Sequence, residues 1–167
     1  MKNRQFRFLK SFQYAFRGIV YCINNERNMR IHAVVALYVF VFSFFFQMSR
    51  ERYAALFITF AIVLMAEMFN TVAEELSDMV AASYHPVVRI VKDLAAGAVL
   101  ICAVFAVGVG ICIFWQPTAF VKMFHFFCAY PAMIAVFLVA TAMAVIFIAA
   151  GPLGIRDTIK HKCKLKL

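Results

Sequence analysis

The chain has 167 residues, of which 65% are hydrophobic and 15% are charged, and its formal net charge is +9. Average soluble domains are roughly 45–50% apolar and about 25% charged, and one globular core of this size cannot bury so much apolar surface. The composition therefore excludes an ordinary soluble domain and a disordered chain. Beside a mean hydropathy of +0.86, the positive charge indicates a membrane surface and predicts no nucleic-acid partner. The five cysteines contain no C-x-x-C pair and are interpreted as structural.

Residues 4–23 predict an amphipathic helix that lies on the membrane surface. Apolar side chains recur every three or four positions from Phe8 to Ile23, while Lys10 and Arg17 fall largely on other faces. This pattern is typical of an interfacial helix with a basic polar face. A plain basic leader that only sets the topology is the alternative.

Four apolar stretches approach or exceed the ~20 residues that a bilayer requires. They run over about 31–48, 53–68, 94–115 and 126–150. Within the last stretch, Pro131 suits a helix start and Gly151-Pro152 suits a helix stop. The sequence therefore predicts an all-α membrane protein with a surface helix and four spans.

Lysine and arginine are distributed unevenly between the segments that connect these spans. Fourteen of the 17 lie before the first span, between the second and third, or after the fourth. The positive-inside rule then places both termini in the cytoplasm.

The carboxylates gather in one part of the chain, since five of the eight lie between positions 67 and 93. Four polar residues at spacings of three, four and four share one narrow stripe of the second span. They are Glu67, Asn70, Glu74 and Asp78. If this helix enters the bilayer near Tyr53, Glu67 lies ~21 Å down, inside a hydrocarbon core ~30 Å thick. Glu74 then reaches the cytoplasmic boundary, whereas Glu75 falls on a solvated flank.

This stripe suits phosphoryl transfer at a membrane surface. Burial brings Glu67 towards the range of a general base, and carboxylates at the boundary, such as Glu74, can hold Mg²⁺ together with substrate phosphates. Lys92 and Asp93 follow in the same cytoplasmic segment, where a lysine can neutralise a phosphate oxygen. No P-loop or G-x-G-x-x-G motif is present, so a conventional kinase fold is excluded while ATP use is not. A helix–helix packing role for the stripe is the alternative.

Two segments resemble a known family. AEMFNTVAEELSD at 66–78 and SYHPVVRIVKDLAAGAVL at 83–100 fit the pattern E-x-x-N-x-x-x-E-x-x-x-D followed by a His and K-D. This pattern is similar to that of the small bacterial membrane lipid kinases, the diacylglycerol kinase and undecaprenol kinase family. FRFLKSFQYAFRG at 6–18 and NERNMRIH at 25–32 also resemble it.

The resemblance implies an enzyme of the bacterial inner membrane that transfers the γ-phosphate of Mg-ATP to a lipid hydroxyl and forms homotrimers. It implies that Glu67 is the general base and that Glu26 and Glu74 hold the metal. It places Asn70 at a polar position of the active site. Contacts with ATP are implied for Arg7, Tyr14, Ser83, Tyr84, His85, Lys92 and Asp93.

The chain departs from the family pattern after the third span, where the family's members usually end. We therefore expect a lipid kinase domain over 1–115 and an accessory extension over 116–167, with a fourth helix and a basic tail. The segment 85–100 favours undecaprenol over diacylglycerol as the substrate, by resemblance. Two other functions remain open: an ion-coupled transporter that uses Glu67 and Asp78, and a non-catalytic subunit that docks a partner on the stripe.

Overall fold

The computed structural model describes the backbone of residues 2–80 and 86–164, and the side chains of residues 8–80 and 86–155. These residues form helices and no strand, which confirms the predicted all-α class. The helices are α1 (Lys2–Asn25), α2 (Arg27–Ser43), α3 (Arg50–Val80), α4 (Pro86–Phe114), α5 (Pro117–Ala129) and α6 (Pro131–Lys164).

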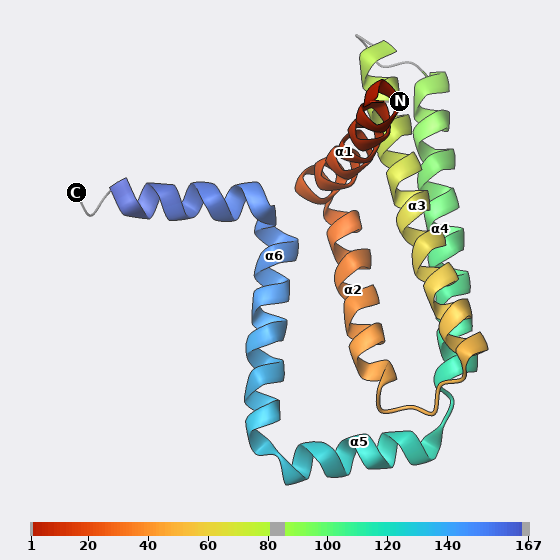
Figure 1. Ribbon diagram of the computed structural model, residues 1–167, viewed down its shortest axis with the longest axis vertical. Helices are drawn as coiled ribbons and strands as arrows, with labels where there is room; N and C mark the ends of the chain where they lie inside the picture. Colours follow the sequence, from red (N-terminus) through yellow and green to blue (C-terminus); the bar gives the residue numbers. More distant parts are fainter. Residues whose placement is uncertain (1, 81–85, 165–167) are drawn as a thin grey trace.

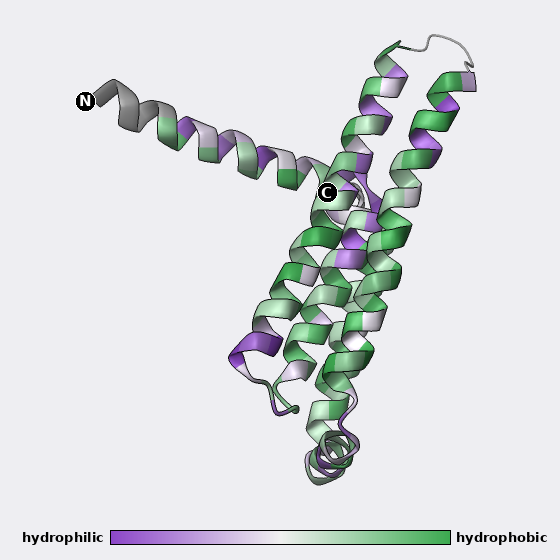
Figure 2. Ribbon diagram, turned by 90° about the vertical axis from the view of Figure 1, so that its right-hand side faces the viewer, coloured by the Kyte–Doolittle hydropathy of each residue, from purple (hydrophilic) through white to green (hydrophobic). Residues whose placement is uncertain are grey.

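Four helices run lengthwise beside one another, and two others lie across the ends of this bundle. α3 and α4 form a long hairpin, α2 lies beside α3, and α6 flanks α2 on its other side, while α5 crosses the far end (Figure 1). α1 projects sideways from the opposite end, and hydrophilic residues gather there (Figure 2). The α3–α4 hairpin extends beyond the corner between α1 and α2 (Figure 1).

Three of the described helices are long and apolar enough to cross a membrane: α3, α4 and the part of α6 from Pro131 to Ile155. α2 has 17 residues, about 26 Å at ~1.5 Å per residue, and it ends at Ser43 rather than at the predicted position 48. Large apolar side chains face outwards, as Phe105 does with 72% exposure. Such an exterior suits lipid, where surface apolar area carries no penalty.

The fourth predicted span is divided by prolines. Hydropathy predicts a span over 126–150, but Tyr130 leaves the helical conformation with φ −125° and ψ 74°, and Pro131 begins a new helix. Residues 126–129 therefore belong to α5. At its other end the span stops at Gly151, where φ is +66°, and the rest of α6 turns outwards, away from the other helices (Figure 1). The predicted start at Pro131 and stop at Gly151-Pro152 are both confirmed.

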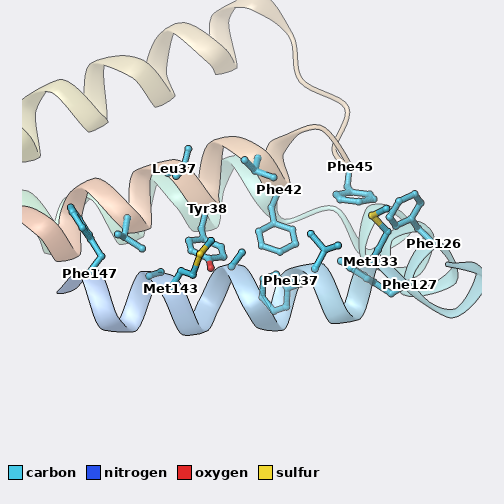
Figure 3. Close-up of a pocket in the computed structure, with 15 residues that line it drawn as sticks. Leu37, Tyr38, Phe42, Phe45, Phe126, Phe127, Met133, Phe137, Met143 and Phe147 are labelled. Atoms are coloured by element: carbon cyan, nitrogen blue, oxygen red, sulfur yellow. The ribbon is translucent and has the colours of Figure 1, made fainter. Parts of the chain in front are cut away.

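α6 packs on α2 through aromatic side chains and one polar contact. The hydroxyl groups of Tyr38 and Thr141 lie 3.1 Å apart, and the Phe137 ring meets the Tyr38 ring edge-on, with centroids 5.9 Å apart. An apolar groove of about 590 Å³ runs between the two helices (Figure 3). The extension is thereby joined to the family part of the chain.

Candidate active site

A buried carboxylate lies a little beyond the middle of α3. Glu67 is only 1% exposed, and Asn70 and Thr71 beside it are also buried. The Thr71 hydroxyl donates to the Glu67 carbonyl oxygen at 3.1 Å, which turns the hydroxyl away from the carboxylate. The burial that the sequence predicts for Glu67 is confirmed.

Glu67 faces a histidine of the neighbouring helix. His32 Nε2 of α2 lies 3.2 Å from Glu67 Oε1, and the two side chains are 22% and 2% exposed. From the sequence, His32 is interpreted as an interfacial polar residue outside the site, because nothing in the sequence indicates which face of α2 meets α3. The only available signal was its position six residues after Glu26, near the polar end of the first span.

One turn beyond Glu67, two predicted site residues contact each other. Asn70 Nδ2 donates to Glu74 Oε1 at 2.8 Å, and Glu74 is half-buried. Asn70 Oδ1 is buried without a hydrogen-bond partner. A buried amide oxygen without a partner is unusual in a folded protein, and it can accept a bond from a ligand.

Glu26 comes to the same region from the corner between α1 and α2. It is the N-cap residue of α2, but its side chain makes no capping hydrogen bond. Burial raises the Glu26 pKa, and so do the carboxylates of Glu74 and Glu75, whereas Arg30 lowers it. The effect of Glu74 on this pKa places the two predicted metal ligands within electrostatic reach of each other.

Glu75 is exposed, as predicted, but it also holds α1. The Tyr21 hydroxyl of α1 donates a hydrogen bond to Glu75 Oε1. This bond raises the Tyr21 pKa above its usual range, so the phenol stays a donor at neutral pH. α1 is thereby attached to α3 close to the carboxylates.

Lys92 and Asp93 lie on the first turns of α4 and point to different partners. Lys92 Nζ pairs with Asp78 Oδ1 across the hairpin. Asp93 Oδ2 lies 3.8 Å from Arg89 Nε, and both of these side chains are largely exposed. The hairpin therefore brings the predicted stripe and the K-D pair to the same end of the molecule, beyond α1 (Figure 1).

Comparison with known proteins identifies the family. The sequence pattern of prokaryotic diacylglycerol kinase matches residues 13–114. The chain belongs to this family. The matched residues contain the whole described cluster around Glu67, and they end where α4 ends.

Three relatives show how far the similarity extends. A diacylglycerol kinase of Synechocystis is 38% identical over 110 residues, 65% of this chain and 63% of that protein, so the chain spans less than two thirds of it. An undecaprenol kinase of Bacillus subtilis is 34% identical over 113 residues, 68% of this chain and 92% of the relative. A diacylglycerol kinase of Escherichia coli is 25% identical over 110 residues, 66% of this chain and 90% of the relative. The resemblance found in the sequence is confirmed.

Among the remaining residues that the family pattern points to, the structure describes the side chain of Tyr14, which belongs to α1. Tyr14 is exposed on the projecting part of α1, where the Arg17 guanidinium lies 5.9 Å from its ring centroid (Figure 2). The side chain of Arg7 and residues 83–85 (Ser83, Tyr84 and His85) lie outside the described part of the structure.

The donor set fits a magnesium ion that is shared with substrate phosphates. Among the described residues, no group of three or more His, Cys, Asp or Glu side chains is arranged to hold a metal by itself. Glu26 and Glu74 instead offer two hard oxygen donors, and Mg²⁺ commonly takes one or two carboxylates and completes its shell with phosphates and water. The arrangement thus fits a metal that arrives with a nucleotide.

An apolar cavity lies beside the contact of His32 with Glu67. It has a volume of about 340 Å³ and lies among α2, α3 and α4. His32 lines it together with Val35 and Val63, and His32 is the residue that contacts Glu67. A hydrocarbon chain in this cavity would bring its polar end to the carboxylate.

Proposed function

We propose that this family member is a lipid kinase that transfers the γ-phosphoryl group of ATP to the hydroxyl of a membrane lipid. The observation that carries the proposal is Glu67, a buried carboxylate that faces His32 beside an apolar cavity. The Asn70–Glu74 pair continues from it towards the hydrophilic end of the molecule. The lipid hydroxyl and the nucleotide would meet between these groups.

The reaction is a proton transfer coupled to an in-line displacement. Glu67 accepts the proton of the lipid hydroxyl as the oxygen attacks the γ-phosphorus, the bond to the bridging oxygen breaks, and ADP leaves. Positioning is the main contribution of the protein to such a reaction. His32 would support it from its place 3.2 Å from one oxygen of the Glu67 carboxylate, and the apolar cavity would exclude water that competes with the lipid.

Glu26 and Glu74 would hold Mg²⁺, which supplies charge neutralisation on the β- and γ-phosphates when it is bound. The Asn70 amide orients the Glu74 carboxylate, because it donates to one oxygen and leaves the other for the metal. Lys92 would leave its ion pair with Asp78 and bind a phosphate oxygen of the nucleotide. Asp93 would contact the same nucleotide.

A homotrimer would complete the nucleotide site. α1, which carries Tyr14, projects away from the bundle of its own chain (Figure 2). In an oligomer, this helix of one chain can reach the carboxylates of a neighbour, and we expect Arg7, Ser83, Tyr84 and His85 to contact the nucleotide there. We place the protein in the bacterial inner membrane with both termini in the cytoplasm, because this arrangement puts the site where ATP is found.

We favour undecaprenol as the lipid, with diacylglycerol as the alternative. The names of the relatives include both lipids, and the segment 85–100 resembles the undecaprenol kinase branch. Label transfer from γ-³²P-ATP to each lipid in mixed micelles with Mg²⁺ separates the two substrates.

Glu67→Gln is the matched control, because it keeps the shape of the side chain and removes the base. We expect at least about a hundredfold loss of transfer, with unchanged nucleotide binding and melting temperature. A Glu67→Gln variant that labels lipid at the wild-type rate would contradict the role of Glu67. If the folded wild-type chain labels neither lipid, the kinase proposal fails, and the transporter and docking-subunit alternatives take its place.

A further inference from the structure

Arg30 is a buried cation that joins three helices. It lies in the first turn of α2 and is 7% exposed. Its Nη1 donates to the carbonyl oxygens of Ile23 at 3.0 Å and Asn24 at 3.1 Å, both in the last turn of α1. Its Nε donates to the carbonyl oxygen of Ile148 in α6 at 3.1 Å. One guanidinium therefore ties the surface helix and the extension to the start of α2.

Each of these carbonyl groups needs a hydrogen-bond donor from outside its own helix. The last four carbonyl groups of a helix have no N–H four residues on within that helix, which covers Ile23 and Asn24. Ile148 would pair with the N–H of residue 152, but this residue is Pro152, which has none. Arg30 satisfies all three, and a cation is favourable at the negative ends of two helix dipoles.

The backbone of Gly151 lies directly against the Arg30 guanidinium. Its φ of +66° is strained for any residue with a side chain. A Cβ atom at this position would also lie 3.0 Å from Arg30 Nη1 and 3.2 Å from Arg30 Cζ. A side chain at position 151 would therefore strain the backbone, and the guanidinium would have to shift by a few tenths of an ångström.

The guanidinium makes no ion pair with Glu26, although its charge is near enough to lower the Glu26 pKa. The two residues are four apart, with Glu26 as the extended N-cap residue of the helix that holds Arg30. The described ion pairs nevertheless include none between them, because the guanidinium is directed to the three carbonyl groups. Glu26 keeps a carboxylate that no cation of its own helix occupies.

We propose that α6 positions Arg30 so that Glu26 stays free to bind the metal of the nucleotide. This inference rests on the proposed function, in which Glu26 is a metal ligand. In it the extension is a working part of the site, and Arg30 is a positioning residue. If a side chain at position 151 displaces the guanidinium of Arg30, the guanidinium turns to Glu26 and competes with the metal.

The test uses electron paramagnetic resonance to measure how tightly Mn²⁺ binds to the full chain in lipid micelles. A non-hydrolysable ATP analogue is present throughout. We expect Gly151→Ala to weaken Mn²⁺ binding at least fivefold. Gly154→Ala is the matched control, because its Cβ would meet only the Ala150 Cβ at an ordinary 3.7 Å, and it should bind Mn²⁺ as the wild type does.

A second substitution separates competition from a general loss of structure. Adding Arg30→Gln to Gly151→Ala removes the competing charge, so Mn²⁺ affinity should return towards that of the wild type. If Gly151→Ala does not fold, Arg30→Lys and Arg30→Gln replace it. Both substitutions remove the guanidinium that bonds the three carbonyl groups. Only the lysine keeps a positive charge, so only Arg30→Lys should weaken Mn²⁺ binding.

Three outcomes would overturn the inference. Gly151→Ala could bind Mn²⁺ as tightly as the wild type, the double variant could bind no better than Gly151→Ala, or Arg30→Lys and Arg30→Gln could bind equally. In each case the wild type still binds the Mn²⁺–nucleotide complex, and the proposed function stands. A wild-type chain that binds no Mn²⁺ with the nucleotide would overturn both together.

Discussion

At the scale of single residues, the site depends on a carboxylate that is expensive to place. An ionisable side chain in the hydrocarbon region costs at least ~2–3 kcal/mol on insertion scales, and Glu67 is almost completely enclosed. His32 Nε2 lies 3.2 Å from its carboxylate, but Glu67 Oε1 has no hydrogen-bond partner among the described residues. The histidine is therefore a polar neighbour of Glu67, and the carboxylate oxygen stays available to a substrate hydroxyl.

Replacing His32 tests whether it helps to position Glu67. His32→Leu keeps a similar volume and removes the nitrogen, so we expect kcat to fall about tenfold, or ~1.4 kcal/mol, with little change in the KM for ATP. His32→Gln retains a donor and should recover part of the rate. His125→Leu, at an exposed histidine on α5, is the control. Equal rates for His32→Leu and His125→Leu would show that the contact does not assist transfer.

Glu26 predicts an effect of pH on stability. Its pKa is raised in the folded chain, so its contribution to stability is fully present below the ordinary glutamate pKa and is lost as pH rises through the raised value. At about pH 7 the ionised side chain thus destabilises the fold. Glu26→Gln should raise the melting temperature by a few degrees there, and the gain should vanish near pH 4.

Thermal unfolding in micelles at the two pH values measures this effect. Glu51→Gln is the control, because Glu51 is an exposed acid in the first turn of α3, where a negative charge is favourable. It should bring no gain at neutral pH. A Glu26→Gln variant that melts at or below the wild-type temperature at neutral pH would contradict the destabilising effect assigned to the ionised Glu26 side chain.

At the scale of the helices, hydropathy predicts which segments enter the membrane but not where each one turns. The long spans of α3 and α4 and the surface helix α1 follow from apolar runs and periodicity. The division between α5 and α6 does not, because residues 126–150 are apolar throughout and only the backbone at Tyr130 and Pro131 breaks the run. Prolines, rather than hydropathy, set the ends of this span.

The same reasoning explains which parts of the site could be predicted. Glu67, Asn70 and Glu74 belong to one helix, so their common face follows from spacing alone. The contacts of His32 with Glu67 and of Arg30 with Ile148 join different helices. Such contacts depend on which helix faces meet, and a single sequence does not indicate this.

The attachment of α1 to α3 gives a prediction at this scale. Tyr21→Phe removes the hydrogen bond to Glu75, which joins α1 to α3. We expect amide hydrogen exchange over residues 8–25 to rise by up to about tenfold. Tyr130→Phe, at an exposed tyrosine between α5 and α6, should leave exchange in α1 unchanged. Unchanged exchange in Tyr21→Phe would mean that other contacts hold this helix.

At the scale of the whole molecule, charge and chain direction agree. α1 and the last part of α6 lie at the same end of the bundle, and α5 crosses the opposite end (Figure 1). Fourteen of the 17 basic residues belong to segments at the first end. Because cytoplasmic segments of membrane proteins are rich in lysine and arginine, this end should face the cytoplasm, together with the carboxylates.

Reporter fusions in bacterial cells test this orientation. Alkaline phosphatase is active only after export, so a fusion after residue 167 should be inactive, whereas a fusion after Tyr130, at the end of α5, should be active. A fluorescent protein that folds only in the cytoplasm should give the opposite pattern at both sites. An active phosphatase after residue 167 would place Glu26 and Glu74 outside the cell, where they could not meet ATP. That result would contradict the orientation and the kinase mechanism together, because the lipid hydroxyl and the nucleotide must reach Glu67 from the same leaflet.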